Sequence, residues 1–222
     1  MKIMTLLFIL ISPFIINAQV VHYNIQGVIH DSQNAKFAYL LGISRQDTYK
    51  IAPIINGKFS FIDTVDLKGV SFYRTAYLVL SDRANITREE VNSQVNQSIG
   101  RSNQSTPILK KVVLEETNLE IESPDKLNLA KVSSGGLLTI ELEELDANKK
   151  NLKAFILKHP DSPLSISAIR NLYYSFRVPV EIAVLEERMG SPRELFPLLS
   201  ERWRLSKEGV ELKKNIDEIY SR

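Results

Sequence analysis

The hydrophobic pattern changes its period once along this 222-residue chain, at about residue 136. Before that point, short runs alternate apolar and polar residues, as in Val21 to Gln26, which is typical of half-buried strands. From about Thr139, apolar residues recur every three or four positions, as in amphipathic helices. Strands followed by helices argue against a βαβ fold. The sequence therefore predicts an α+β protein, with an N-terminal antiparallel β-sandwich or barrel-like sheet over residues 19–136 and a helical region over residues 137–222.

Asn56-Gly57 marks the sharpest predicted turn in the β-rich part. It joins two β-rich runs, residues 48–55 and 58–65. Asn-Gly is the dipeptide best able to adopt positive φ at both central positions of a type I′ turn, so we expect a tight hairpin. Alternation along the second run predicts that Phe59 and Phe61 share one face.

Further strands are predicted at residues 36–43, 72–80, 108–115, 118–122 and 127–132. Segment 72–80 is apolar on both sides, which indicates a central strand covered on two faces. Residues 81–107 are rich in Asn, Gln, Ser and Arg, and we expect a long surface loop with at most one weak amphipathic turn. The few large apolar residues of this loop are Ile86, Val91, Val95 and Ile99.

The helical region contains several start and stop signals. One helix is predicted from about Thr139 to His159-Pro160, where the proline ends it. Ser162 is the predicted N-cap of the next helix, with Pro163 in its first turn. Later helix starts are predicted at Val178-Pro179, with an end at Gly190, at the capping box Ser191-Pro192-Arg193-Glu194, and at Ser206.

The N-terminus predicts export. Lys2 precedes an apolar run, and a small residue follows at Ala18, which is typical of a secretory signal occupying residues 1–18 and cleaved near Ala18. A membrane anchor is the weaker alternative, because Pro13 interrupts the run and a spanning helix needs about 20 residues. We therefore expect a periplasmic or secreted protein that is not stably inserted in the membrane after cleavage.

Charge and cysteine content exclude two classes of function. Of the 28 basic residues only Lys2 falls in the predicted signal, which leaves 27 against 26 acidic residues. A net charge near zero gives no reason to expect a nucleic-acid partner. The chain has no cysteine, so neither a disulfide nor thiol chemistry of its own is available.

Three histidines are the candidate bases or nitrogen ligands. His22 and His30 are eight residues apart on one strand run, and they make a poor metal site without a nearby carboxylate. Gly27 between them is a candidate bulge. His159 precedes Pro160 at a helix end, where we expect its imidazole to interact with free carbonyl groups.

The other candidate sites are expected to have structural roles. The acidic cluster, made of Glu141, Glu143, Glu144 and Asp146, is expected to form a solvated face near a helix start. Gly135-Gly136 lacks the helix frame of a phosphate-binding loop and is expected to be a loop. Among the aromatic residues Tyr39, Tyr49, Phe59, Phe61, Phe72, Tyr73 and Tyr77, the phenylalanines are expected in the core and a tyrosine or two on an exposed face. The sequence predicts no catalytic residue, cofactor or metal site.

Three segments carry a family resemblance. They are Asn56-Gly57-Lys58-Phe59-Ser60-Phe61, Val112-Val113-Leu114-Glu115, and residues 155–165 around His159-Pro160-Asp161-Ser162-Pro163. In this order they resemble the N-terminal region of Bacteroidetes envelope thiol-disulfide oxidoreductases, a β-rich domain of the DUF4369 type followed by a helical segment. In that family a thioredoxin-like domain with Cys-x-x-Cys follows. This chain ends at Arg222, about where that domain would begin, so the resemblance implies a free-standing version of the non-catalytic half.

The functional prediction follows from the resemblance and the missing cysteines. We expect a non-enzymatic interaction module of the cell envelope that acts on protein or peptide partners. Two alternatives stay open at this point. One is a sandwich that binds a small ligand or a glycan on exposed tyrosines, and the other is a hydrolase that uses carboxylates alone.

Overall fold

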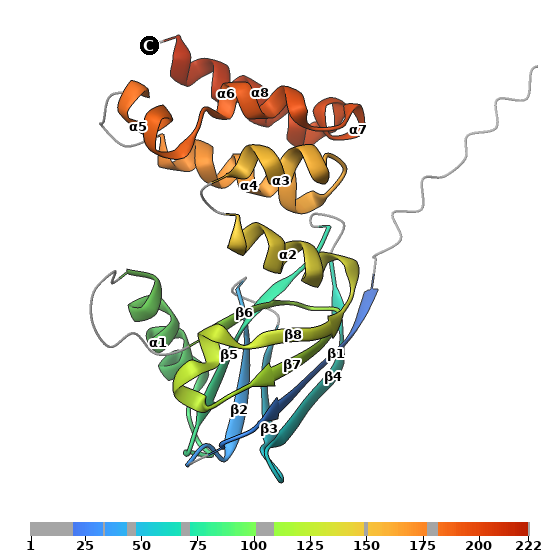
Figure 1. Cartoon of the computed structure of the whole chain (residues 1–222), viewed down its shortest axis with the longest axis vertical. Helices are drawn as coiled ribbons and strands as arrows, with labels where there is room; N and C mark the ends of the chain where they lie inside the picture. Colours follow the sequence, from blue (N-terminus) through green and yellow to red (C-terminus); the bar gives the residue numbers. More distant parts are fainter. Residues whose placement is uncertain are drawn as a thin grey trace, which may run out of the picture.

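A computed structural model describes residues 20–32, 34–43, 48–67, 72–100, 109–148, 151–176 and 182–221. The predicted signal, residues 1–18, lies outside these ranges. Two four-stranded sheets stack as a sandwich, and helices α2 to α8 gather at one end of it (Figure 1). This architecture confirms the predicted α+β class. The two sheets remain separate in the described ranges, so the sandwich form of the prediction holds and the barrel form does not.

Each sheet draws its strands from both halves of the β-rich part. The first sheet has the order β4-β1-β7-β8, formed by β4 (Lys58–Asp66), β1 (Val20–Ile29), β7 (Glu116–Ile121) and β8 (Lys131–Gly135). The second has the order β3-β2-β5-β6, formed by β3 (Tyr49–Pro53), β2 (Phe37–Gly42), β5 (Thr75–Ser81) and β6 (Leu109–Val113). β1 and β7 run parallel, whereas the other described pairs are antiparallel. The sandwich is therefore mixed.

The Asn56-Gly57 turn forms as predicted, but the hairpin does not. Asn56 has φ 50° and Gly57 has φ 72°, as a type I′ turn requires. Beyond a single bridge between Ile55 and Lys58, the two strands separate: β3 pairs with β2 and β4 pairs with β1. Because β4 matches β1 over nine residue pairs, the turn serves to pass the chain from one sheet to the other.

The core between the sheets follows the predicted alternation. Phe59 and Phe61 are both buried in it. Their neighbours include Tyr23, Ile25, Leu40, Leu78, Leu119 and Ile121. β1 passes through Gly27 without a break, so the bulge expected there is absent. A Cβ atom at this position would overlap the ring of Phe59. The glycine is therefore needed to leave room for this ring, and not to form a kink.

The segment expected to be a loop contains a helix. α1 (Arg88–Gly100) lies over the outer face of the β3-β2-β5-β6 sheet (Figure 1). Its residues Val91 and Val95, four positions apart, are buried against Tyr39 and Val79. The loop prediction is wrong because it gave more weight to the polar composition of the segment than to this helical spacing. β5 is a central strand covered on both faces, as predicted, since Val79 faces α1 while Leu78 faces the inner core.

The helical region is more divided than the sequence predicts. Its helices are α2 (Leu137–Ala147), α3 (Leu152–Lys158), α4 (Pro163–Ser175), α5 (Ile182–Met189), α6 (Pro192–Leu195), α7 (Glu201–Leu205) and α8 (Lys207–Tyr220). The single helix expected from Thr139 to His159 is two, because Asn148 caps α2 and the Asn151 side chain accepts the Ala154 N–H at the start of α3. The strand expected at residues 127–132 begins later, since Pro124–Leu129 forms a 3₁₀ helix (η1).

Two of the predicted helix starts form with their side-chain caps. Ser162 accepts the Leu164 N–H, and Ser206 accepts the Gly209 N–H. α6 begins after Ser191 as predicted, but the capping box does not form, because the Ser191 hydroxyl bonds to the hydroxyl of Tyr220. A 3₁₀ turn, Phe196–Leu198 (η2), follows α6. α5 ends before Gly190, and its predicted start at Val178-Pro179 lies outside the described residues.

The helical region packs against the end of the sandwich. α2 contacts β6 and β8, and Lys110 on β6 forms an ion pair of 2.8 Å with Glu143 on α2. Phe72, which precedes β5, meets the ring of Trp203 on α7 edge to face, with centroids 4.6 Å apart. Both parts therefore depend on contacts across this boundary. No helix in the described ranges is long and apolar enough to cross a membrane.

Candidate functional site

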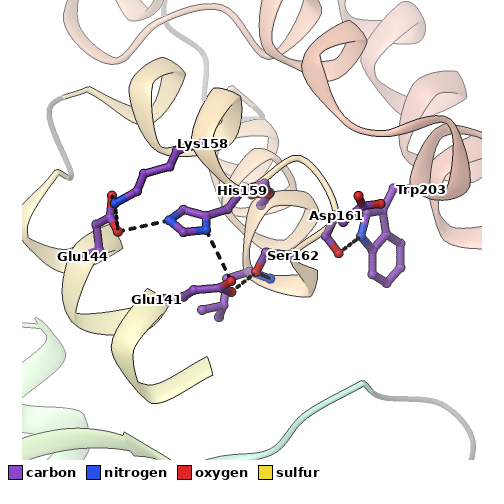
Figure 2. A network of polar contacts seen from close by, with 9 residues as sticks. Glu141, Glu144, Lys158, His159, Asp161, Ser162 and Trp203 are labelled. Atoms are coloured by element: carbon purple, nitrogen blue, oxygen red, sulfur yellow. Dashed lines mark hydrogen bonds and ion pairs between the residues drawn. The ribbon is translucent and has the colours of Figure 1, made fainter. Parts of the chain in front are cut away.

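Five polar side chains come together where α2 meets the turn between α3 and α4. Figure 2 shows Glu141 and Glu144 of α2 facing Lys158, His159 and Ser162. The His159 Nδ1 lies 3.3 Å from a Glu141 oxygen, and its Nε2 lies 3.0 Å from a Glu144 oxygen. The Ser162 hydroxyl donates to Glu141 at 2.5 Å, and the Lys158 ammonium lies 2.8 Å from Glu144. These five side chains are called the hinge network below.

Local sequence rules explain why these groups meet. Glu141 and Glu144 are three residues apart, so they project from the same face of α2. Pro160 prevents α3 from continuing, which leaves His159 as its C-cap residue. Ser162 then starts α4 as its N-cap. Since α3 folds back against α2, the turn places these side chains opposite the two carboxylates.

Burial and charge set the state of the hinge network. Glu141 is 6% exposed, so its carboxylate depends on Ser162 and His159 in place of water. A carboxylate oxygen lies near each ring nitrogen of His159, so the ring connects Glu141 and Glu144. Hydrogen bonds from Lys158 and then His159 hold the pKa of Glu144 below its ordinary value of 4.5, because they favour the charged carboxylate.

The order of groups in the hinge network does not fit nucleophilic catalysis. A serine nucleophile needs an imidazole between its hydroxyl and the carboxylate, so that the imidazole can take the proton. Here the carboxylate of Glu141 stands between Ser162 and His159. The Ser162 oxygen also accepts the Leu164 N–H at 3.1 Å. Both functions of the hydroxyl are therefore used in fixing α4 to α2.

The lowered pKa of Glu144 predicts a stability change in acid. Because the pKa is lower in the folded state, the contribution of this carboxylate to stability is present above pH 4.5 and is lost as the pH falls through the folded-state pKa. Glu144→Gln should remove this dependence. We expect urea midpoints of the wild-type protein to fall more steeply on acidification than those of E144Q. Parallel curves for the two proteins would contradict the assignment.

Of the acidic cluster only Asp146 is exposed, so the expectation of a solvated face is wrong for the three glutamates. Glu143 pairs with Lys110, and Asp146 raises the pKa of Tyr77 as the second cause after burial. None of the acidic residues lies in the first turn of α2. The expected role of His159 is also wrong in part: its backbone caps α3, but its ring faces carboxylates rather than carbonyls.

The start of α2 resembles an anion site that the chain fills itself. Gly136 is the N-cap residue of α2, and the Glu115 carboxylate accepts the N–H of Thr139. A Cβ atom at Gly136 would overlap that carboxylate. The glycine therefore makes room for an internal anion at the positive end of the helix. Gly135 is the last residue of β8, so only part of the expected loop is irregular.

The other sequence candidates lie apart from the hinge network. His22 and His30 are exposed, and alternation along β1 places both on the outer side of its sheet. No group of three or more His, Cys, Asp or Glu side chains that could hold a metal ion occurs within the described ranges. Phe59 and Phe61 lie in the core as expected. For Phe72 the expectation is wrong, since it is 45% exposed with its ring against Trp203. Tyr73 is partly buried against the helical region.

None of the candidate tyrosines is exposed, so the expectation that one or two would lie on an exposed face is wrong. Tyr39 and Tyr49 stack with ring centroids 6.2 Å apart, and their hydroxyls donate to the carbonyls of Arg83 and Ile86 at the approach to α1. Tyr77 packs in the same cluster. The helix that covers this sheet thus removes the surface on which tyrosine rings would have met a ligand.

Comparisons with protein-family models, with curated proteins and with solved structures gave no match. Fold and site together define an α+β protein in which a mixed two-sheet sandwich supports a helical region, with a partly buried polar network where α2 meets the α3–α4 turn. The resemblance to the N-terminal part of envelope oxidoreductases stays a prediction.

Proposed function

We propose that this chain is an exported, non-catalytic interaction module of the cell envelope that binds a protein or peptide partner. One observation carries the proposal. The groups best suited to chemistry, Glu141, His159 and Ser162, are bound to one another as structural links, while a whole sheet face is left open to contacts. A scaffold that uses its reactive groups for its own rigidity is suited to presenting a surface.

The open face belongs to the β4-β1-β7-β8 sheet. Strand register aligns a row of small polar side chains across it, formed by Ser60, Gln26, Asn118 and Ser134. The exposed apolar side chains of Val28 and Ile62 flank this row, and Val20 is exposed further along β1. The opposite sheet is covered by α1. A mixed polar and apolar face of this kind has the composition of a non-obligate protein interface.

The family resemblance supports the envelope as the place of action. Disulfide exchange requires an attacking thiolate, and the chain has no cysteine. The partner class we favour is therefore another envelope protein, with a separate thioredoxin-like enzyme as the first candidate.

Site-specific photo-crosslinking in intact cells tests this function. A photoreactive residue in place of Val28 should capture a defined envelope protein, whereas one in place of Leu205, exposed on α7, should not. Gln26→Glu adds a negative charge two residues from Val28 and should reduce capture through position 28. Failure to recover any protein through position 28, or thiol-disulfide turnover by the purified chain, would count against the proposal.

A small-ligand or glycan-binding protein remains the second candidate. It is favoured by a hollow of about 180 Å³ on the same open face, lined by Gln26, His30, Asn118 and Ser133 among others. Amide, imidazole and hydroxyl groups can bind sugar hydroxyls. A rise in melting temperature with oligosaccharides, abolished by Asn118→Ala, would favour this candidate over the first.

A further inference from the structure

β4 presents the longest unpaired edge of the sandwich. It forms one margin of the first sheet (Figure 1), and in the described ranges its far side is paired only at Lys58, by the bridge to Ile55 of the turn. The strand spans nine residues, and Ile62 near its middle is 76% exposed. A long edge with an exposed apolar residue is a template for adding another strand.

The direction of the β4 amides follows from one hydrogen bond. The Ile29 N–H donates to the Gly57 carbonyl at 2.7 Å, and in an antiparallel pair this direction repeats every second residue. The odd-numbered residues of β4 therefore bond to β1. The backbone groups of Ser60, Ile62 and Thr64 point away from β1, toward the open edge.

The other three edges carry features that discourage pairing. β3 has five residues and ends in Pro53, which has no N–H to donate. β8 is equally short and has an irregular register against β7. β6 lies against α2 and η1. Short length, proline, irregular register and a covering helix protect edge strands, as do charged side chains. β4 has none of the first four and relies on charges alone, at Lys58, Asp63 and Asp66.

The sequence of β4 is complementary to itself about Ile62. In an antiparallel arrangement with a two-fold axis at this residue, Ile62 faces its copy and Ser60 faces Thr64. Ile55 occupies the backbone position beside Lys58 on this edge, so at each end only the side chains of Lys58 and Asp66 approach each other, which brings opposite charges together twice. Apolar, hydroxyl and charged pairs of this kind each stabilise a cross-strand contact.

We propose that the β4 edge is a self-association surface, on which a second copy of this chain adds its own β4 in antiparallel register about Ile62. The β4-β1-β7-β8 sheets of the two copies then form one continuous eight-stranded sheet. Such an interface is isologous and closes at two copies, because each edge is used once. The proposal does not depend on the proposed function, since the open sheet face stays accessible in the dimer.

The contact should be weak and reversible. The Lys58 N–H and carbonyl already bond to Ile55 in the turn, so backbone pairing is limited to the three outward residues. The Thr64 N–H lies 2.7 Å from its neighbour Asp63 and must leave this carboxylate to pair. A short edge contact belongs among transient interfaces, so dimer formation should depend on concentration.

Sedimentation velocity of the mature chain from about 1 µM to about 1 mM tests the proposal. We expect a monomer–dimer equilibrium that Ile62→Lys weakens at least about tenfold. Leu129→Lys is the matched control, because Leu129 is 69% exposed in η1 and lies outside this edge. Circular dichroism checks that each variant is folded. A monomer at every concentration, or a dimer unaffected by I62K, would overturn the proposal.

A charge exchange distinguishes a second copy of this chain from an unrelated peptide that pairs with the same edge. Lys58→Glu alone puts a negative charge near Asp66 of the second copy and should weaken the dimer, while K58E/D66K should restore it. Hydrogen exchange adds a residue-level readout: protection of the Ser60 and Ile62 amides should rise with concentration, and that of Phe59 and Phe61 should not. Absence of restoration in K58E/D66K would overturn the register.

Discussion

Replacing Trp203 with alanine is expected to lower the free energy of unfolding by about 3 to 5 kcal/mol, the usual cost of deleting a buried large aromatic side chain. Trp203 is 2% exposed in the core of the helical region. Its indole N–H donates to the Asp161 carbonyl at 2.7 Å, and its ring meets Phe72 from the sandwich. One side chain therefore connects α7, the α3–α4 turn and the boundary between the two parts.

Trp203→Phe separates packing from hydrogen bonding. Phenylalanine keeps most of the ring volume but leaves the Asp161 carbonyl without the indole donor, so we expect a smaller loss of about 1 to 2 kcal/mol. Urea unfolding followed by circular dichroism measures both variants. If W203A costs less than W203F, or if both are neutral, this side chain does not hold the boundary.

Elements set by neighbouring residues are predictable from the sequence. The Asn56-Gly57 turn and the helix starts at Ser162 and Ser206 each depend on chemistry within about four positions, and all three form as expected. α1 combines both kinds of signal: Thr87 and Glu90 form a capping box at its start, which the loop prediction missed, and Val91 and Val95 are buried on a distant sheet. Tertiary packing of this kind overrides local composition. The parallel pairing of β1 with β7 also joins residues far apart in the sequence, so local patterns do not predict it.

The hinge network could be predicted only in part, because it depends on a break in a helix. The spacing of Glu141 and Glu144 indicates a common face, and Pro160 indicates the end of the helix that carries His159. In a continuous helix, however, the fifteen residues from Glu144 to His159 would separate them by about 22 Å along the axis. Because α2 ends at Asn148 and α3 starts after Asn151, the two side chains come together.

Glu141→Ala is expected to cost about 2 kcal/mol of unfolding free energy. The substitution leaves the buried Ser162 hydroxyl without its acceptor and one ring nitrogen of His159 without its carboxylate. Glu218→Ala is the matched control, because this glutamate belongs to an exposed pair with Lys214 on α8. Surface pairs of this kind contribute little, so the control should change stability by less than about 0.5 kcal/mol.

A double-mutant cycle tests whether Glu141 acts through Ser162. Ser162→Ala alone should cost about 1 kcal/mol through the lost helix cap. Because the two side chains share one hydrogen bond, the E141A/S162A protein should lose less stability than the sum of the single variants, by about 0.5 kcal/mol or more. Strict additivity would mean that the two residues stabilise α2 and α4 separately. In that case the hinge network would be a set of neighbouring caps rather than one connection between the sandwich end and the helices beyond it.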